Sequence, residues 1–214
     1  MMKALARLYK KCKQSNVSFL VVLVRYIYFL FFGKRIFAYK NCTVIGLKNI
    51  NTEGVLQVGI GQNSFMMNSD KTLLAIDGKL NIIGNSYIEK GCRLDIGESA
   101  IVNLNKVFIN ANCLFVIKNG LDIGEGSVVS WNCQFLDEDF HNITYENKTE
   151  KSKKIVIGKH VWIGANSVIM KGISIADGCV IAANSIVTKS VEEQNVLIAG
   201  HPAKIIKREV EWKI

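Results

Sequence analysis

Large aliphatic side chains recur every six residues in the last third of the chain. A period of six matches neither the 3.6-residue period of an α-helix nor the two-residue period of a single strand. It is typical of a chain that makes a short strand, turns and repeats, so that three turns close a triangular coil of about 18 residues. The pattern predicts that each aliphatic residue stacks on its counterpart one coil away, at a spacing of ~4.8 Å. The repeating positions are Ile157, Ile163, Ile169, Ile175, Ile181 and Val187.

The same period extends toward the N-terminus, with shifts of phase. Gly or Ala follows four of the six C-terminal aliphatics, which suits tight corners where a bulky side chain would be crowded. An ordinary β-sandwich with accidental spacing is the alternative, and six consecutive hits at one phase disfavour it. We therefore expect an all-β solenoid domain over residues 41–200. The earlier repeats are at Ile117, Ile123, Val129 and Phe135, with weaker traces at Ile76, Ile82, Ile88, Ile96 and Val102.

The segment before the solenoid is basic and apolar. Val17 to Phe32 is almost wholly apolar, but sixteen residues are short for a membrane span of roughly 20, and Arg25 would be costly inside a bilayer. No small-x-small cleavage site follows the apolar run, which argues against a signal peptide. We expect residues 1–40 to contain a helix that lies on the membrane surface or packs against the main domain, with a true span as a third alternative. The expected location is cytoplasmic, with peripheral contact to the inner face of the membrane.

The net charge of +9 comes entirely from this N-terminal segment. Residues 1–40 contain nine basic residues and no acidic residue, whereas the remaining 174 residues carry 18 of each. This distribution points to anionic lipid headgroups and away from nucleic acid, for which the chain has no recognisable motif. The six cysteines form no CxxC pair, so neither a zinc site nor a redox site is predicted, and free thiols in a reducing compartment are the simplest interpretation.

The segments IVIGKHVWIGANSVIMKGISIADGCVIAANSIVTKSV and AGHPAKIIK resemble the C-terminal signature of the hexapeptide-repeat acyltransferase family. The resemblance is strong over about 117–207 and looser over 40–116. Within the family, the DEDFH stretch and the short apolar N-terminus are most similar to polysaccharide and lipopolysaccharide O-acetyltransferases. The resemblance implies a left-handed parallel β-helix, a homotrimer, and acetyl-CoA bound as co-substrate in the cleft between subunits. A short C-terminal helix is expected to cap the solenoid over residues 201–214, because Pro202 suits a first helical turn.

A polar insert, the loop 136–154, interrupts the repeat. Phe135 and Ile157 are 22 residues apart where six are expected, and such an excursion from a rigid solenoid is a natural place for function. Acetyl transfer to a hydroxyl needs a general base, and the resembled enzymes have a catalytic histidine in the matching loop, so we carry that role to His141. Asp139 or Asp137 could orient its imidazole, and so could a backbone carbonyl. The alternative is that His141 is a solvated loop residue.

The remaining candidate residues come from the same resemblance. Small residues permit close approach of the CoA arm, and cations suit its phosphates. Many relatives have arginine in place of Lys204 and Lys207, and lysine loses the bidentate contact that arginine makes. Trp162 is expected to be exposed, where it could stack on cofactor or acceptor or contact a neighbouring subunit. The cofactor candidates are Ala165, Ala183, Thr188, Lys189, Lys204, Lys207 and Trp162, and the weaker acceptor candidates are Asn110 and Asn112.

These patterns predict an acetyl-CoA-dependent O-acetyltransferase that acts on a sugar hydroxyl of a surface polysaccharide or its precursor. The alternatives are an N-acetyltransferase acting on an amino sugar and a non-catalytic solenoid scaffold. A serine O-acetyltransferase would need a larger helical N-terminal domain, and an ice-binding solenoid would show threonine ladders. His160 and His201 are expected to be solvated, and the spacing of the three histidines does not fit the zinc site of the γ-class carbonic anhydrases, so no metal is predicted.

Overall fold

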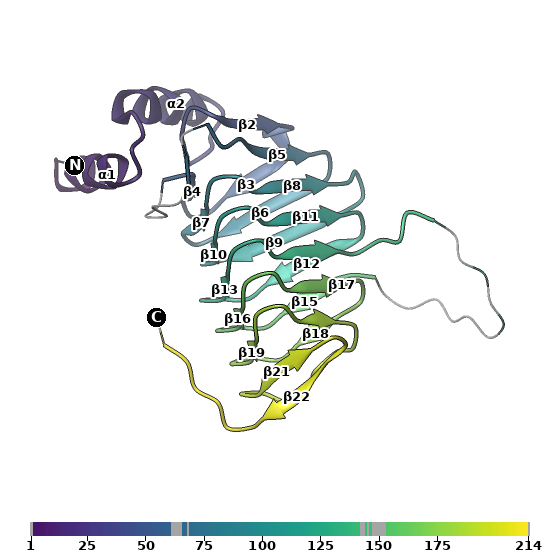
Figure 1. Ribbon diagram of the computed structural model, residues 1–214. Coiled ribbons are helices and arrows are strands. Elements are labelled where there is room, and N and C mark those ends of the chain that lie inside the picture. Colours follow the sequence, from purple (N-terminus) through teal and green to yellow (C-terminus); the bar gives the residue numbers. More distant parts are fainter. Residues whose placement is uncertain are drawn as a thin grey trace.

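The chain forms a parallel β-helix in which three sheets wind around a common axis (Figure 1). The computed structural model describes residues 2–60, 66–67, 69–141, 144, 146 and 153–213. Two helices, α1 (Met2–Gln14) and α2 (Phe19–Phe31), lie at the N-terminal end of the coil stack, and a loop after β14 projects from its side (Figure 1). The predicted solenoid is therefore confirmed.

Each turn of the coil contributes one strand to each sheet. A one-turn 3₁₀ helix, η1 (Leu47–Asn49), precedes β3. The first sheet contains β1 (Ile36–Ala38), β4 (Leu56–Val58), β7 (Ser86–Ile88), β10 (Phe108–Ile109), β13 (Val128–Val129), β16 (Trp162–Ile163), β19 (Val180–Ile181), β21 (Leu197–Gly200) and β22 (Ala203–Lys207). The second contains β2 (Cys42–Ile45), β5 (Thr72–Ile76), β8 (Arg93–Ile96), β11 (Leu114–Ile117), β14 (Gln134–Leu136), β17 (Val168–Met170) and β20 (Ile186–Val187). The third contains β3 (Ile50–Thr52), β6 (Lys79–Ile83), β9 (Ile101–Asn105), β12 (Gly120–Ile123), β15 (Ile155–Ile157) and β18 (Ser174–Ile175).

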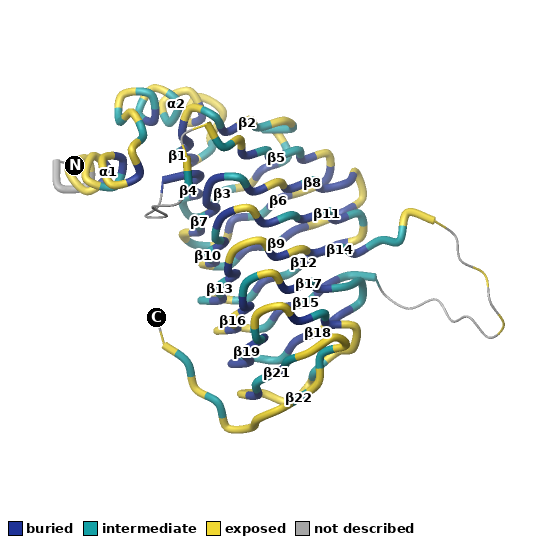
Figure 2. Tube along the Cα trace, viewed as in Figure 1, coloured by how far each residue is buried: buried dark blue, intermediate teal, exposed yellow. Residues whose placement is uncertain are grey.

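The six-residue repeat builds the interior as expected. Ile163 pairs in register with Ile181, which lies 18 residues further along the chain, and Ile169 pairs with Val187 in the same way. All six repeating aliphatics are at most 2% exposed. Dark-blue buried positions recur on successive coils in Figure 2, and Phe115 stacks on Phe135 at a ring-centroid distance of 4.5 Å. Apolar burial at these positions is the main source of stability of the fold.

The six cysteines are free and buried, and thiols at the corners of the coil donate hydrogen bonds to backbone carbonyls. The thiol of Cys113 donates to the carbonyl of Ser130 at 3.0 Å, and that of Cys133 donates to the carbonyl of Gly164 at 3.2 Å. The pKa of the Cys133 thiol is raised above its usual range by its contact with Cys113 and by burial. A neutral buried thiol is inert, so these side chains fill corners and are not nucleophiles.

The outward faces of the first and third sheets differ. The third sheet has a ladder of amides in which Asn51 donates to Asn81, Asn81 to Asn103, and Asn103 to Asp122, at 2.7–2.9 Å. On the first sheet, by contrast, Tyr87, Phe108, Val128 and Trp162 form an outward column in register from coil to coil. The third sheet therefore presents a polar face, and the first an apolar one.

One prediction for the chain ends is confirmed and the other was wrong. The predicted apolar N-terminal helix is α2, which begins after the N-cap Ser18, whose side chain accepts a hydrogen bond from the amide of Val21, and a further helix, α1, precedes it. The predicted C-terminal helix is instead a strand, since β22 pairs antiparallel with β21 and extends the first sheet. The unpaired edge of β21 offers a full row of hydrogen-bonding groups, and pairing with it outweighs the helical tendency of this short segment.

Candidate active site

The projecting loop leaves the coil immediately after β14, and its first residue is held by the backbone of the preceding coil. Asp137 is fully buried, and its carboxylate accepts hydrogen bonds from the amides of Lys118, Asn119 and Gly120 at 2.6–2.7 Å. Three amide donors satisfy a buried carboxylate well. Because both oxygens are occupied here, the structure places Asp137 as a support for the loop and away from the role of orienting His141.

The next two acidic residues form ion pairs across the neck of the loop. Both carboxylate oxygens of Glu138 lie 2.8 Å from Nζ of Lys153, which stands at the other end of the loop. The carboxylate of Asp139 pairs with Lys171, which follows β17 one coil further on. The sequence does not reveal Lys153 and Lys171 as partners of these carboxylates, because they lie 15 and 32 residues away along the chain.

His141 lies just beyond this neck and is exposed. Its Nδ1 is 3.4 Å from the backbone carbonyl oxygen of Asp139, and Phe140 between them has a left-handed backbone (φ 62°). Of the three possible orienting groups, the contact in the structure is with the carbonyl. A hydrogen bond from Nδ1–H to a carbonyl fixes the tautomer in which Nε2 carries a free lone pair. The part of the loop from 142 to 152 lies mostly outside the described residues.

The cofactor candidates are divided between two edges of the triangular coil. Ala165 and Ala183 share the corner between the first and second sheets, where the amide of Asn184 donates to the carbonyl of Ala165 at 2.8 Å. Thr188 and Lys189 are exposed after β20, at the corner from which the loop with His141 leaves. In a single chain, the small residues Ala165 and Ala183 therefore lie on a different edge of the coil from Thr188 and Lys189.

Lys204 and Lys207 lie on β22 and are exposed. Lys204 is opposite Ala199 and Lys207 is opposite Leu197, so both extend from the edge of the first sheet. Trp162 is 40% exposed on β16 of the same sheet, which confirms its predicted exposure, and its Nε1 donates to Oγ of Ser130 at 3.0 Å.

The acceptor candidates Asn110 and Asn112 lie at the corner after β10, in the coil before the loop. The side-chain amide of Asn110 donates to the carbonyl of Val129 at 2.8 Å, which is a structural contact between coils. Asn112 is exposed and has a left-handed backbone (φ 60°), a conformation that asparagine tolerates. Among the described residues, the contact of its side-chain amide is a long one of 3.9 Å to the sulfur of Met66, and Asn112 is therefore the more available of the two.

His160 has a partner that the sequence did not suggest. Its ring stacks on Trp212 of the C-terminal tail at a centroid distance of 4.1 Å, and Nε1 of Trp212 donates to the carbonyl of His160 at 2.8 Å. The tail also brings Trp212 to 6.1 Å from Trp162. His160 thus fixes the tail beside the exposed Trp162 and is not placed as a free base.

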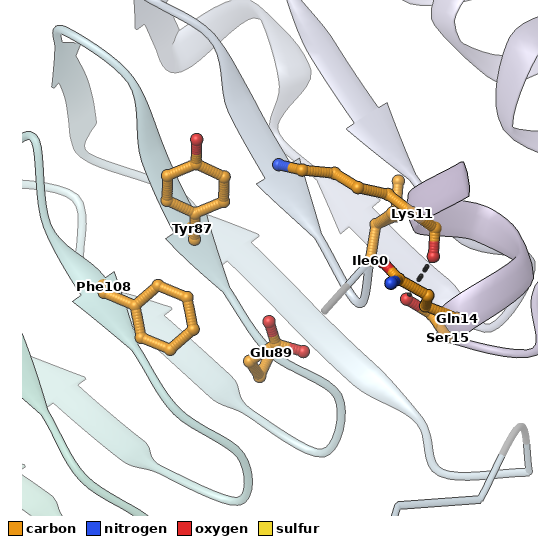
Figure 3. A pocket seen from close by; sticks show the side chains of 7 residues that line it. All are labelled: Lys11, Gln14, Ser15, Ile60, Tyr87, Glu89 and Phe108. Carbon is orange, nitrogen blue, oxygen red and sulfur yellow. Dashed lines mark hydrogen bonds between the residues drawn. The ribbon is translucent and has the colours of Figure 1, made fainter. Parts of the chain in front are cut away.

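A cavity of about 310 Å³ lies between α1 and the first sheet (Figure 3). Lys11 reaches into it from α1, with Nζ 4.8 Å from the centre of the Tyr87 ring. Glu89 is only 3% exposed there, and burial raises its pKa to about 7, partly offset by Lys90 and Lys11. The remaining lining residues are Gln14, Ser15, Ile60 and Phe108. The cavity is formed by different elements from the loop that carries His141.

Similar proteins share both the sequence pattern and the fold. A family model described as the hexapeptide repeat of succinyl-transferase matches residues 154–189. An uncharacterised 24.8 kDa protein in the cps region of Klebsiella pneumoniae is 38% identical over 95% of this chain and 93% of that protein. WbbJ of Escherichia coli K12, described as a putative lipopolysaccharide biosynthesis O-acetyl transferase, is 32% identical over 62% of this chain and 73% of that protein.

Among solved structures, AntD, an N-acyltransferase from Bacillus cereus in complex with dTDP-4-amino-4,6-dideoxyglucose and coenzyme A, superposes with a TM-score of 0.55. The match covers 84% of this chain and 82% of that chain at 17% identity, which supports the fold alone. The repeat, the coil geometry and the match to 73% of the length of WbbJ agree, and on these grounds the chain belongs to the hexapeptide-repeat acetyltransferase family.

Proposed function

We propose that this protein transfers an acetyl group from acetyl-CoA to a sugar hydroxyl of a surface polysaccharide or its precursor, with His141 as general base. The observation that carries the proposal is the contact between Nδ1 of His141 and the Asp139 carbonyl, on a loop whose neck is closed by ion pairs. A histidine with Nδ1 occupied presents Nε2 as the basic nitrogen. Such a base activates an alcohol, which is a poor nucleophile at neutral pH.

The reaction needs no covalent enzyme intermediate. Nε2 of His141 takes the proton of the acceptor hydroxyl while its oxygen attacks the thioester carbonyl of acetyl-CoA. The tetrahedral oxyanion collapses with cleavage of the carbon–sulfur bond, and the CoA thiolate receives the proton from His141. The products are the sugar acetate and CoA. The buried, neutral cysteines of the corners are consistent with this direct transfer.

Acetyl-CoA is proposed to bind between two copies of the chain in a homotrimer. Ala165, Ala183 and Trp162 lie along one edge of the coil, while Lys189 and the loop that carries His141 belong to another edge. A cleft between neighbouring copies can bring two different edges together, which a single coil cannot do. Lys204 and Lys207 on the exposed strand β22 are suited to the phosphates of CoA.

A sugar hydroxyl is proposed as acceptor because of the relative WbbJ, which matches 62% of this chain. WbbJ is described as a putative O-acetyl transferase of lipopolysaccharide biosynthesis. The second candidate is transfer to the amino group of an amino sugar, since AntD shares the fold and is an N-acyltransferase. A reducing, cytoplasmic location agrees with six free cysteines and with acetyl-CoA as co-substrate.

Calorimetric titration of acetyl-CoA into the purified protein tests the proposal without knowledge of the acceptor. We expect saturable binding near one molecule per chain, weakened in Lys189→Ala and unchanged in Lys79→Ala, an exposed lysine on β6. Transfer of labelled acetyl groups to a panel of oligosaccharides then separates ester from amide products by their lability to mild base. Absence of acetyl-CoA binding in folded protein would favour the scaffold.

A further inference from the structure

The helix α2 has two apolar faces, and the solenoid covers only one of them. Phe29 is 3% exposed and packs into the core of the coils, and the fully buried Val22 packs with Leu8 and Cys12 of α1 and with Ile60. On the same side, Nη2 of Arg25 donates to the carbonyl of Cys42 at 2.7 Å, and Tyr26 stacks on Phe37 at 3.9 Å between centroids. These contacts fix the orientation of α2 on the end of the coil stack.

The opposite side of α2 is apolar and exposed. Its residues follow the spacing of one helical face, and they range from 47% to 85% exposed. This outer face of α2 consists of Leu20, Val24, Ile27, Tyr28 and Phe31, and Leu30 and Phe32 beside it are also exposed. A contiguous apolar patch of this kind is unusual on a soluble surface and marks an interaction site.

The charged side chains of the N-terminal segment itself are all cationic. Residues 1–40 contain no Asp or Glu, and exposed cations lie on α1 and in the segment after α2: Arg7, Lys10, Lys13, Arg35 and Lys40. Tyr9 of α1 contacts Phe19 at the start of α2, with ring centroids 5.6 Å apart, so the basic helix lies beside the apolar one. Lys11 is not part of this surface, because it points into the cavity toward Tyr87 (Figure 3).

The cations beside the outer face of α2 indicate what kind of partner covers it. A second copy of the chain docked through the same face would bring one set of unbalanced cations against another, which is unfavourable. An anionic bilayer satisfies both features at once, since an in-plane helix buries its apolar face among the acyl chains while flanking Lys and Arg contact the headgroups. Within the described residues, no helix is long and apolar enough to cross a membrane, and the 13 residues of α2 span only about 20 Å.

We propose that the outer face of α2, together with the exposed cations of α1 and residues 35–40, docks the protein on an anionic phospholipid surface with α2 lying in the plane of the interface. Both helices lie at the N-terminal end of the stack, so the coils that carry the His141 loop and the C-terminal strands extend away from the bilayer (Figure 1). The docking surface and the proposed acetyl-transfer site are thus formed by different parts of the chain. Membrane docking can be tested without any transfer reaction.

The test is co-sedimentation of the full-length protein with phosphatidylcholine vesicles that contain or lack phosphatidylglycerol, at low and high salt. Each cation near an anionic surface contributes about a fivefold change in partitioning, so Lys10→Gln/Lys13→Gln should lower binding about 25-fold. Leu20→Ser/Phe31→Ser removes the most exposed apolar residues of the face and should lower it about tenfold or more. The matched controls are Lys79→Gln/Lys213→Gln and Ile83→Ser/Ile101→Ser, which change exposed residues elsewhere and should bind like wild type.

Circular dichroism melting of every variant separates lost docking from lost folding, and Phe31→Ser alone serves if the double variant unfolds. Equal binding to vesicles with and without phosphatidylglycerol would overturn the role of the cations. A wild-type protein that stays in the supernatant with both vesicle types would overturn docking altogether. A change in oligomeric mass of Leu20→Ser/Phe31→Ser in analytical ultracentrifugation would show that a second copy covers the face, which also overturns the proposal.

Discussion

Glu138 and Lys153 lie at the two ends of the projecting loop, and Nζ of Lys153 is 2.8 Å from both carboxylate oxygens of Glu138. The pair closes the neck of the loop, between the end of β14 and the start of β15. The Lys153 ammonium and, after it, the amide of Asp139 lower the pKa of Glu138 to about 2. A depressed carboxyl pKa means that the pair is intact above its ordinary value of 4.5 and weakens as the pH falls toward 2.

We expect Glu138→Gln to lower turnover about tenfold to a hundredfold, because a loosened neck displaces His141 from the acceptor. The affinity for acetyl-CoA should change little, since Glu138 is not among the proposed cofactor contacts. Steady-state kinetics and limited proteolysis of the loop measure the two effects. Glu125→Gln, which breaks the exposed pair with Lys106, is the matched control and should leave both unchanged. If Glu138→Gln kept wild-type turnover while its loop was cleaved faster, the Glu138–Lys153 pair would hold the loop without contributing to catalysis.

His141→Asn should reduce turnover by about 10²–10⁴-fold, the usual contribution of a positioned base. Asparagine keeps the polarity and much of the volume of histidine, so the loop and the binding of acetyl-CoA should be retained. The exposed His201 provides the control, and His201→Asn should keep wild-type turnover. Near-normal activity of His141→Asn would remove His141 from the mechanism and leave it as a solvated loop residue.

Asp137→Ala should destabilise the fold by roughly 3 kcal/mol, because the amides of Lys118, Asn119 and Gly120 lose their buried acceptor. Asp95→Ala breaks an ion pair with Lys118 at the surface and should cost less than about 1 kcal/mol. Thermal unfolding monitored by circular dichroism compares the two. If Asp137→Ala lost activity at an unchanged melting temperature, Asp137 would instead act on His141, as the sequence alone allowed.

Glu89 should make stability depend on pH near neutrality. Burial raises its pKa to about 7, with Lys90 and Lys11 opposing the shift, and the phenol of Tyr87 also lines the cavity. A raised pKa means that the folded state favours the protonated Glu89 carboxyl. Its contribution to the free energy of unfolding is therefore complete below pH 4.5 and is lost as the pH rises through about 7. Unfolding by urea at several pH values should show a fall of up to about 3 kcal/mol in wild type.

Glu89→Gln keeps the hydrogen-bonding shape but cannot ionise, so its stability should stay level over the same range. Glu98→Gln, an exposed carboxylate on the coil, should retain the wild-type slope. An identical slope in Glu89→Gln would mean that the cavity between α1 and the first sheet admits enough water to solvate the carboxylate.

The solenoid, its interior and the place of the loop with His141 were determined by the sequence itself. The six-residue period that includes Ile163 and Ile181 is a local property, and stacking of equivalent residues follows directly once each coil pairs with the next. The break in the repeat between Phe135 and Ile157 likewise locates the loop from the sequence alone. Such a fold is easier to predict from sequence than most, because each coil of a solenoid packs mainly against the adjacent coils.

Only the tertiary structure decided how the acidic residues of the loop are used and how the chain ends fold. Adjacency in DEDFH suggested a carboxylate beside His141, yet Asp137 binds amides of the previous coil and Asp139 pairs with Lys171. Those partners are distant along the chain, so no local pattern reveals them. The segment after Pro202 became a strand because the open edge of β21 offered hydrogen bonds that a short isolated helix cannot match.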